Sequence, residues 1–218
     1  MKIFIIIKHK SERLKRKNFL KIKGYPLWEF FLRKFKKTDQ VFIDTDSQEI
    51  YKKGKKKFKN FTFYKRDKKF IDYENKGKKS PVLMMIKNFL MRYVENDNEI
   101  IVTTHITTPF LKRSTIIDAS KKLKKANFVH SVSEHKHFAW LKKDKKYKKI
   151  NFGKNVNKTQ SLDPIVFSNG AFFIFKKKKF MEINNRLGKK NYYYNLNFPE
   201  SLELDVKNDV KILNSLLK

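Results

Sequence analysis

The sequence predicts a layered α/β fold, because short apolar runs alternate along the chain with segments of helical periodicity. Its 218 residues, 40% of them hydrophobic, suffice for one domain with a sizeable core. No internal repeat interrupts this pattern. We therefore expect a single domain over residues 1–218.

The first apolar run, residues 2–7, is expected to form a fully buried strand. Pro26 occupies a position that favours the start of a helix, and apolar residues follow it at four-residue spacing. The next elements are expected to be a strand at 41–43, a helix at 48–57 and a strand at 61–64. The polar stretch 65–79 is expected to be irregular.

The second half of the chain continues this alternation and then breaks it. Met85 and Phe89 belong to an amphipathic helical pattern. The other regular elements are expected to be strands at 100–103, 128–132 and 171–175 and helices at 115–125 and 206–217. Residues 134–168 are polar, aromatic and rich in lysine, so we expect them to form an insertion within the domain.

Charge is the most conspicuous feature of the composition, with 53 Lys and Arg residues against 21 Asp and Glu and a net charge of +32. Such a charge is typical of nucleic-acid-binding proteins. Here, however, lysines extend from Lys2 to Lys218 instead of gathering in one tail or on one helix face. We interpret most of them as solvated surface residues, with no specific nucleic-acid site, in a field that attracts polyanions such as triphosphates.

Simple counts exclude other classes of protein. The chain has no cysteine, which excludes disulfides and cysteine–zinc sites and fits a reducing compartment. No apolar stretch approaches the roughly 20 residues of a membrane span, and the apolar start is too short for a signal peptide. We expect a cytoplasmic protein without membrane association.

Two segments carry residues suited to phosphate and metal chemistry. Residues 8–18, directly after the first strand, contain several cations that suit phosphate oxygens, but no glycine and hence no Walker motif. Glu203 and Asp205 lie two residues apart, so on an extended segment both carboxylates would face one side and could bind magnesium with triphosphate oxygens. Taken alone, a solvated lysine run and a helix cap at Asp205 are the simpler interpretations.

The pattern Lys-x-x-Ser-x-Arg-x-x-x-Lys-Asn over residues 8–18 resembles the nucleotide-binding motif of the acylneuraminate cytidylyltransferases, and more loosely that of the CMP-Kdo synthetases. Lys8 stands where the family usually has an arginine. Six further segments resemble family motifs in the same order, namely 24–27, 43–50, Ser80, 104–110, 169–175 and 202–205. The resemblance therefore covers nearly the whole chain.

The resemblance implies a three-layer α/β sandwich of the nucleotide-diphosphosugar-transferase type, which is Rossmann-like, with 134–168 as a dimerisation and sugar-site insertion. It implies a magnesium-dependent CMP-sugar synthetase and a homodimer. CTP would be coupled to an acidic 2-keto sugar, such as a sialic, legionaminic, pseudaminic or Kdo-like acid, with release of pyrophosphate. Such an enzyme would serve carbohydrate biosynthesis.

The resemblance also assigns roles to individual residues. Catalytic roles would go to Lys8, Arg13, Lys17 and Asp205, nucleotide binding to Ser11, Asn18, Asp46 and Ser80, sugar contacts to His105, Lys142, Lys158 and Asn169, and Mg²⁺ binding to Glu203 and Asp205.

Two alternatives remain open at this point. The first is a basic nucleic-acid-binding protein built on a decayed transferase scaffold, whose affinity would fall steeply with salt and ignore CTP. The second is a related transferase that uses UTP or a sugar phosphate.

Overall fold

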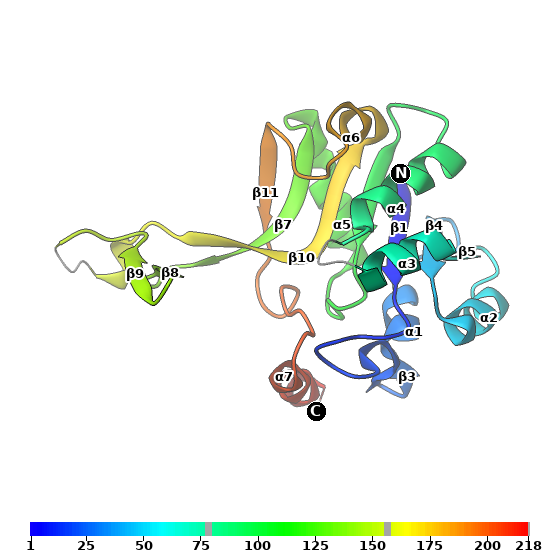
Figure 1. Ribbon diagram of the computed structural model, residues 1–218, viewed down its shortest axis with the longest axis horizontal. Helices are drawn as coiled ribbons and strands as arrows, with labels where there is room; N and C mark the ends of the chain where they lie inside the picture. The colour runs from blue at the N-terminus through cyan, green and yellow to red at the C-terminus, as the bar shows by residue number, and fades with distance from the viewer. Residues whose placement is uncertain (77–79, 155–157, 218) are drawn as a thin grey trace.

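The computed structural model describes residues 1–76, 80–154 and 158–217, and it is built on one seven-stranded mixed sheet (Figure 1). The strand order is β11-β7-β10-β6-β1-β4-β5. Their bounds are Lys2–Ile7 for β1, Gln40–Thr45 for β4, Thr62–Lys65 for β5, Ile100–Thr104 for β6, Phe128–His135 for β7, Ile165–Lys176 for β10 and Asn191–Asn195 for β11. Strands β6, β1, β4 and β5 are mutually parallel, whereas β10 runs antiparallel to both β6 and β7.

Seven α-helices cover the two faces of this sheet within the described residues. Their bounds are Leu27–Leu32 for α1, Gln48–Lys57 for α2, Lys68–Lys76 for α3, Val82–Tyr93 for α4, Arg113–Lys121 for α5, Lys177–Ile183 for α6 and Lys207–Leu216 for α7. Two short hairpins pair β2 (Lys21–Ile22) with β3 (Tyr25–Pro26) and β8 (Trp140–Lys143) with β9 (Lys146–Lys149), and 3₁₀ turns occur at Lys17–Phe19, Lys122–Lys124 and Thr159–Ser161. None of these helices combines the length and apolarity needed to cross a bilayer.

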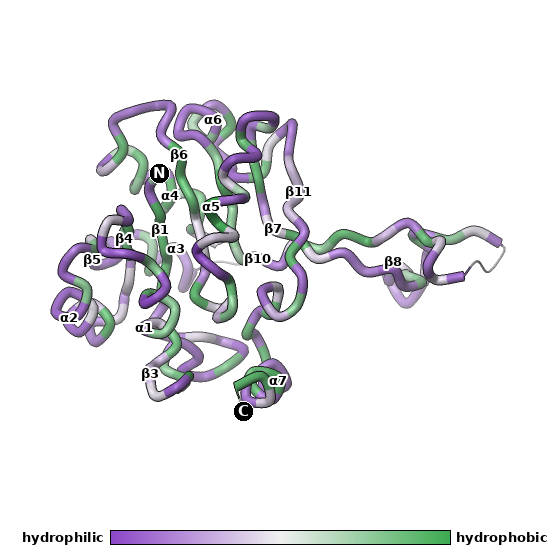
Figure 2. The backbone as a smooth tube through the Cα atoms, turned by 180° about the vertical axis from the view of Figure 1, so that it is seen from behind, coloured by the Kyte–Doolittle hydropathy of each residue, from purple (hydrophilic) through white to green (hydrophobic). Residues whose placement is uncertain are grey.

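The core consists of two apolar clusters, one on each face of the sheet. Phe31 of α1 and Ile116 of α5 pack against one face, whereas Phe89 of α4 and Phe180 of α6 pack against the other. A central parallel strand between two helical layers must be apolar on both sides, which explains the unbroken Ile and Phe run of β1. Hydrophobic residues concentrate in the central strands in Figure 2. The expected three-layer α/β sandwich is thereby confirmed.

One expectation about local structure is wrong, and the elements α6 and β11 were not expected at all. The stretch 65–79, expected to be irregular, contains α3, in which Phe70 is buried. A helix with one buried residue has too weak an apolar periodicity to be recognised in the sequence. Strand β11 was not expected, because it lies at the edge of the sheet and its tyrosines are largely exposed.

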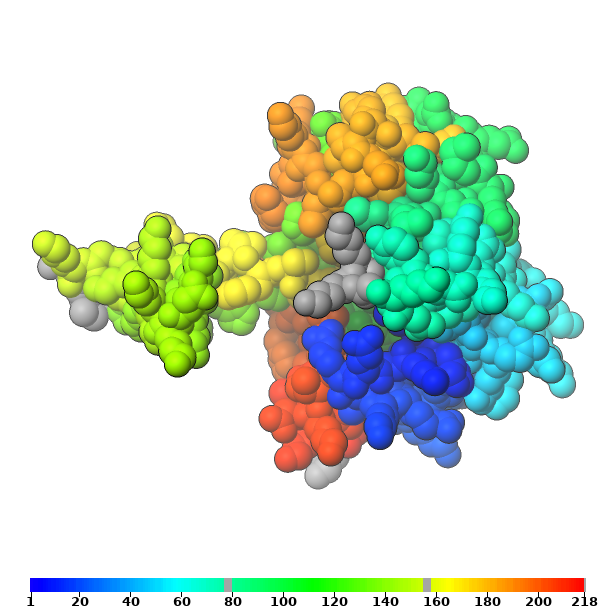
Figure 3. Space-filling view, in the orientation of Figure 1, coloured from blue at the N-terminus to red at the C-terminus, as the bar shows by residue number. Residues whose placement is uncertain are grey.

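The described parts of the segment 134–168, residues 134–154 and 158–168, form an arm that projects from the sandwich (Figure 1, Figure 3). Beyond the sheet, β7 and β10 continue as a two-stranded ribbon that pairs from Ser168 opposite Val132 to Ile165 opposite His135. The β8–β9 hairpin lies toward the tip, and all its residues are exposed. The β8–β9 hairpin therefore does not pack against the core of the sandwich.

Candidate active site

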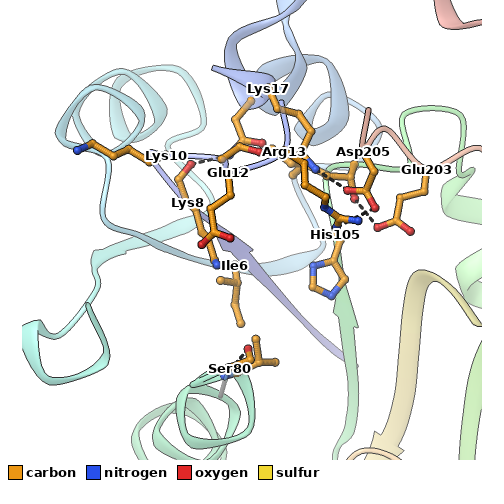
Figure 4. Close-up of a pocket in the computed structure, with 15 residues that line it drawn as sticks. Ile6, Lys8, Lys10, Glu12, Arg13, Lys17, Ser80, His105, Glu203 and Asp205 are labelled. Atoms are coloured by element: carbon orange, nitrogen blue, oxygen red, sulfur yellow. Dashed lines mark hydrogen bonds and ion pairs between the residues drawn. The ribbon is translucent and has the colours of Figure 1, made fainter. Parts of the chain in front are cut away.

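A cavity of about 330 Å³ opens at the carboxyl ends of β1 and β6. Its walls come from four parts of the chain: the loop after β1, the start of α4, the turn after β6 and the segment before α7 (Figure 4). The carboxyl ends of parallel strands meet at one edge of the sheet, which is where open α/β sheets bind ligands. The topology thus joins residues that are about 190 positions apart.

The loop after β1 is held in one conformation by its own buried residues. Leu14 is buried, and Lys17 and Asn18 are buried in the 3₁₀ turn that ends the loop. The Asn18 side-chain amide donates to the carbonyl oxygen of Lys8 at 2.5 Å, which closes the loop across its base. Arg16 adopts a left-handed conformation with φ 55°, which reverses the chain there. The loop therefore presents its cations to the cavity without any glycine.

Asp205 lies opposite this loop and forms two ion pairs with it. The Lys17 ammonium is 2.9 Å from Oδ1 of Asp205, and Arg13 Nη2 is 2.9 Å from Oδ2. Asp209 fixes the backbone behind the carboxylate, because its Oδ2 accepts from the amides of Asp205 and Val206 at 2.7 and 2.8 Å. Asp205 is therefore not the helix cap, and its carboxylate is directed into the cavity.

Glu203 places a second carboxylate at the same wall. The Thr107 hydroxyl donates to its Oε1 at 3.4 Å, and the Leu204 amide donates to the Thr107 carbonyl at 2.8 Å. The segment has no regular secondary structure, but both carboxylates reach the cavity. Burial raises the pKa of Glu203, and the negative charge of Asp205 raises it further.

These two carboxylates fit a magnesium ion. A divalent cation would relieve the repulsion that raises the pKa of Glu203, and oxygen ligands are those that Mg²⁺ prefers. Within the described residues no third Asp, Glu, His or Cys joins them in a metal-binding cluster. Phosphate oxygens and water would have to complete the coordination.

His105 lines the cavity at the end of β6 and stays uncharged at neutral pH. Burial lowers the pKa of this imidazole to about 4, and the positive charges of Arg186 and Lys17 contribute to the shift. A neutral imidazole can both donate and accept a hydrogen bond, which suits contact with a sugar hydroxyl.

Two residues that the sequence analysis did not select support the site from behind. Arg66 has a fully buried side chain that donates from Nε to Oδ1 of Asp44 at 2.7 Å and from Nη2 to the Ile7 carbonyl at 3.3 Å. It thereby ties the ends of β1 and β4 together. Glu74 of α3 forms an ion pair with Lys8. The rarity of arginine in this lysine-rich chain is the one signal that could have drawn attention to Arg66.

The structure brings most of the selected residues together. Nine line the cavity, namely Lys8, Ser11, Arg13, Lys17, Asn18, Ser80, His105, Glu203 and Asp205. Asp46 lies beside it, since Oδ1 accepts from the His9 amide at 2.7 Å. Asn169 is buried next to Gly170, which faces Glu203. Lys142 and Lys158 do not line the cavity, because they lie on the arm.

A family model described as cytidylyltransferase matches residues 3–217, which is almost the whole chain. The chain belongs to the cytidylyltransferase family. A search of curated proteins finds no match.

Solved structures with similar folds carry the names of two kinds of synthase. One is a 4-diphosphocytidyl-2C-methyl-D-erythritol synthase from Anaerococcus prevotii, at 12% identity and a TM-score of 0.64, with 99% of this chain and 98% of that chain covered. Another synthase of the same name gives 10% identity, a TM-score of 0.69 and coverage of 100% and 99%. A CMP:2-keto-3-deoxy-manno-octonic acid synthetase complexed with CTP gives 11% identity and a TM-score of 0.65, with 99% of this chain and 97% of that chain covered. At these identities the likeness shows the cytidylyltransferase fold alone.

Proposed function

We propose that this cytidylyltransferase couples CTP to an acidic 2-keto sugar of the sialic, legionaminic, pseudaminic or Kdo type, giving the CMP-sugar and pyrophosphate. The observation that carries the proposal is the facing arrangement of the 8–18 loop and the carboxylates of Glu203 and Asp205 around one cavity. The 8–18 loop is also the segment that resembles acylneuraminate cytidylyltransferases.

In the proposed reaction the anomeric hydroxyl oxygen of the sugar forms a bond to the α-phosphorus of CTP. The bond from that phosphorus to the bridging oxygen breaks, and pyrophosphate leaves with the electron pair. The hydroxyl proton is released to a base that we do not assign. Because charge accumulates on phosphate oxygens, positioned cations are the main catalytic device, and Lys8, Arg13 and Lys17 supply them.

The cations of the 8–18 loop that face the site are paired with carboxylates of the same chain. Asp205 forms ion pairs with Arg13 and Lys17, and Glu74 forms one with Lys8. A triphosphate would replace these carboxylates as the partner of the loop cations, and the released Asp205 would hold Mg²⁺ together with Glu203. When bound, Mg²⁺ would supply charge neutralisation for the triphosphate. Ser11, Asn18, Ser80 and Asp46 are proposed to orient the nucleotide.

The acceptor is proposed to bind beside His105 and Asn169, with help from a second subunit. Lys142 and Lys158 lie on the arm, which projects from the body of its own chain (Figure 1). In a homodimer that exchanges arms, these lysines would reach the partner's sugar site. The exposed aromatic and aliphatic residues of the arm support such an interface, among them Trp140, Leu141 and Tyr147.

A second acceptor class is considered because two of the similar folds are named for 4-diphosphocytidyl-2C-methyl-D-erythritol. The diphosphate in that product implies a phosphate as the attacking group. For this chain, the motif resemblance over 8–18 and 169–175 favours the acidic sugar.

The test is a pyrophosphate-release assay with CTP, UTP, ATP and GTP, each combined with the four acidic sugars and with 2C-methyl-D-erythritol 4-phosphate. We expect release only with CTP, magnesium and one class of acidic sugar. The Asp205→Asn variant, purified in parallel, controls for contaminating enzymes. Turnover with 2C-methyl-D-erythritol 4-phosphate and with none of the acidic sugars would contradict the proposed acceptor class. Salt-sensitive DNA binding without any turnover would contradict the proposal that the protein is an enzyme.

A further inference from the structure

A second cluster of side chains lies on the neighbouring strands β10, β7 and β11. Its floor is made by three side chains from neighbouring strands, since Phe173 of β10 pairs with His130 of β7, and His130 pairs with Tyr193 of β11. The rings are close, with 5.7 Å between the Phe173 and His130 centroids and 4.7 Å between those of His130 and Tyr193. Phe173 also pairs with Thr103, two residues before His105.

Cluster and cavity lie on the same face of the sheet. Phe175, two residues after Phe173, packs into the apolar cluster beneath α4 and α6, and side chains alternate between faces along a strand. Ile6, which lines the cavity, packs against the same apolar cluster. The space-filling view shows the α6–β11 connection (orange) and the loop after β1 (blue) on one face, above and below the base of the arm (Figure 3).

Arg186, from the α6–β11 connection, covers this floor. Its guanidinium carbon lies 3.8 Å from the centroid of the Phe173 ring. Arg186 Nη1 is buried without a hydrogen-bond partner, and so is Nδ1 of His130, whose residue is only 6% exposed. Across residues 1–76, 80–154 and 158–217, no carboxylate comes within 4.0 Å of this guanidinium.

Arg186 is partly buried, and a partly desolvated cation without a counter-ion carries a free-energy cost that an anion from outside the chain would remove. Burial lowers the pKa of Arg186 to about 10, which leaves it charged at neutral pH. Its charge also acts on His105, where it lowers the pKa more than the charge of Lys17 does. The charge of Arg186 therefore acts on a residue that lines the cavity.

We propose that Arg186 binds the carboxylate of the acidic sugar within the same subunit, with His130 as a neighbouring hydrogen-bonding group. This inference rests on the proposed function. In a 2-keto acid sugar the carboxylate and the attacking hydroxyl are attached to one carbon, so a group that holds the carboxylate also aims the hydroxyl at the nucleotide. Stacking on Phe173 fixes the guanidinium plane, as bidentate carboxylate binding requires. Arg186 thus becomes a specificity-determining residue, and the arm lysines would contact other parts of the sugar.

The test compares Arg186→Gln and Arg186→Lys with Lys189→Gln, which removes an exposed charge from the same connection. Each enzyme is assayed with the acidic sugar that the wild type uses best and with the C1-carboxamide of that sugar. We expect Arg186→Gln to raise the KM for the acid roughly 10- to 100-fold and to abolish the preference for acid over amide. Arg186→Lys should recover part of the preference, and Lys189→Gln should retain all of it. The KM for CTP should change by less than about twofold in each variant.

The outcomes separate this inference from the function on which it rests. If the wild type uses an acidic sugar and Arg186→Gln keeps the acid-over-amide preference, Arg186 does not bind the carboxylate, although the function stands. A simple folding defect is recognised by a raised KM for CTP and an unchanged preference, and it also overturns the proposal. If no acidic sugar is turned over, the function and this inference fail together.

Discussion

The ammonium of Lys17 lies 2.9 Å from Oδ1 of Asp205, although 188 residues separate the two in the chain. Both are largely buried at the cavity wall, with side-chain exposures of 11% and 20%. This ion pair joins the 8–18 loop, proposed to bind the nucleotide, to the segment proposed to bind the metal, so it links the two halves of the proposed chemistry.

Asp205→Asn should reduce turnover about 100- to 1000-fold, because one stabilising group for the triphosphate and its magnesium is lost. The same change frees Arg13 and Lys17 from their counter-ion. CTP binding measured by calorimetry in EDTA should therefore be as tight as in the wild type or tighter. Weaker binding in EDTA combined with near-normal turnover would contradict the role of Asp205.

Lys17→Met should raise the KM for CTP by roughly 10-fold or more and lower kcat, because a buried cation facing the phosphates is removed. The matched control is Lys15→Met, which removes an exposed charge two residues away that does not line the cavity. If both variants lose the same amount of CTP affinity in steady-state kinetics, general attraction by the basic surface explains the effect and the specific role of Lys17 fails.

Arg66→Met should lower the free energy of unfolding by about 3–5 kcal/mol, because Asp44 would be left as a buried, unpaired carboxylate. The control Arg92→Met breaks an exposed pair with Asp67 and should cost about 0–1 kcal/mol. Adding Asp44→Leu to Arg66→Met should recover most of the loss. Urea denaturation measures all three, and equal losses for Arg66→Met and Arg92→Met would refute the assigned importance of this pair.

His105→Gln should make the protein less sensitive to acid. The pKa of His105 is about 4 in the folded state, against about 6.5 when unfolded, so the unfolded chain binds a proton first as the pH falls. This costs the wild type stability between pH 6.5 and 4, up to about 3 kcal/mol in total. Relative to the wild type, the variant should gain stability over that window. A difference that stays constant from pH 7 to 4 in denaturation experiments would show that His105 does not titrate as described.

The protein should be a homodimer in light scattering at micromolar concentration. Leu141→Asp and Ile150→Asp, which place charges on exposed apolar positions of the arm, should give monomers with reduced activity. Met91→Asp, at an exposed position on α4, is the control and should remain dimeric. A fully active wild-type monomer would contradict both the proposed interface and the proposed roles of Lys142 and Lys158 in a partner's site.

The layered α/β fold and most of its elements can be read from local patterns in the sequence. The apolar run of β1 and the amphipathic pattern of α4 are local, and burial imposes a readable period on each. The 8–18 loop was also recognisable, because its spacing of cations, hydroxyl and amide is contained in eleven consecutive residues. Elements with few buried residues, such as α3 and β11, left no such period.

Only the tertiary structure decided which charges meet. Which carboxylate neutralises Lys17, Lys8 or Arg66 depends on strand order and on distances between segments far apart in the sequence, and neither has a local period. The same holds for Arg186. In the sequence it is one of many basic residues, and it becomes distinctive only in the structure, where it is stacked on Phe173 without a counter-ion. Electrostatic pairing is a property of distance in space, and in a chain with 53 basic residues composition does not determine it.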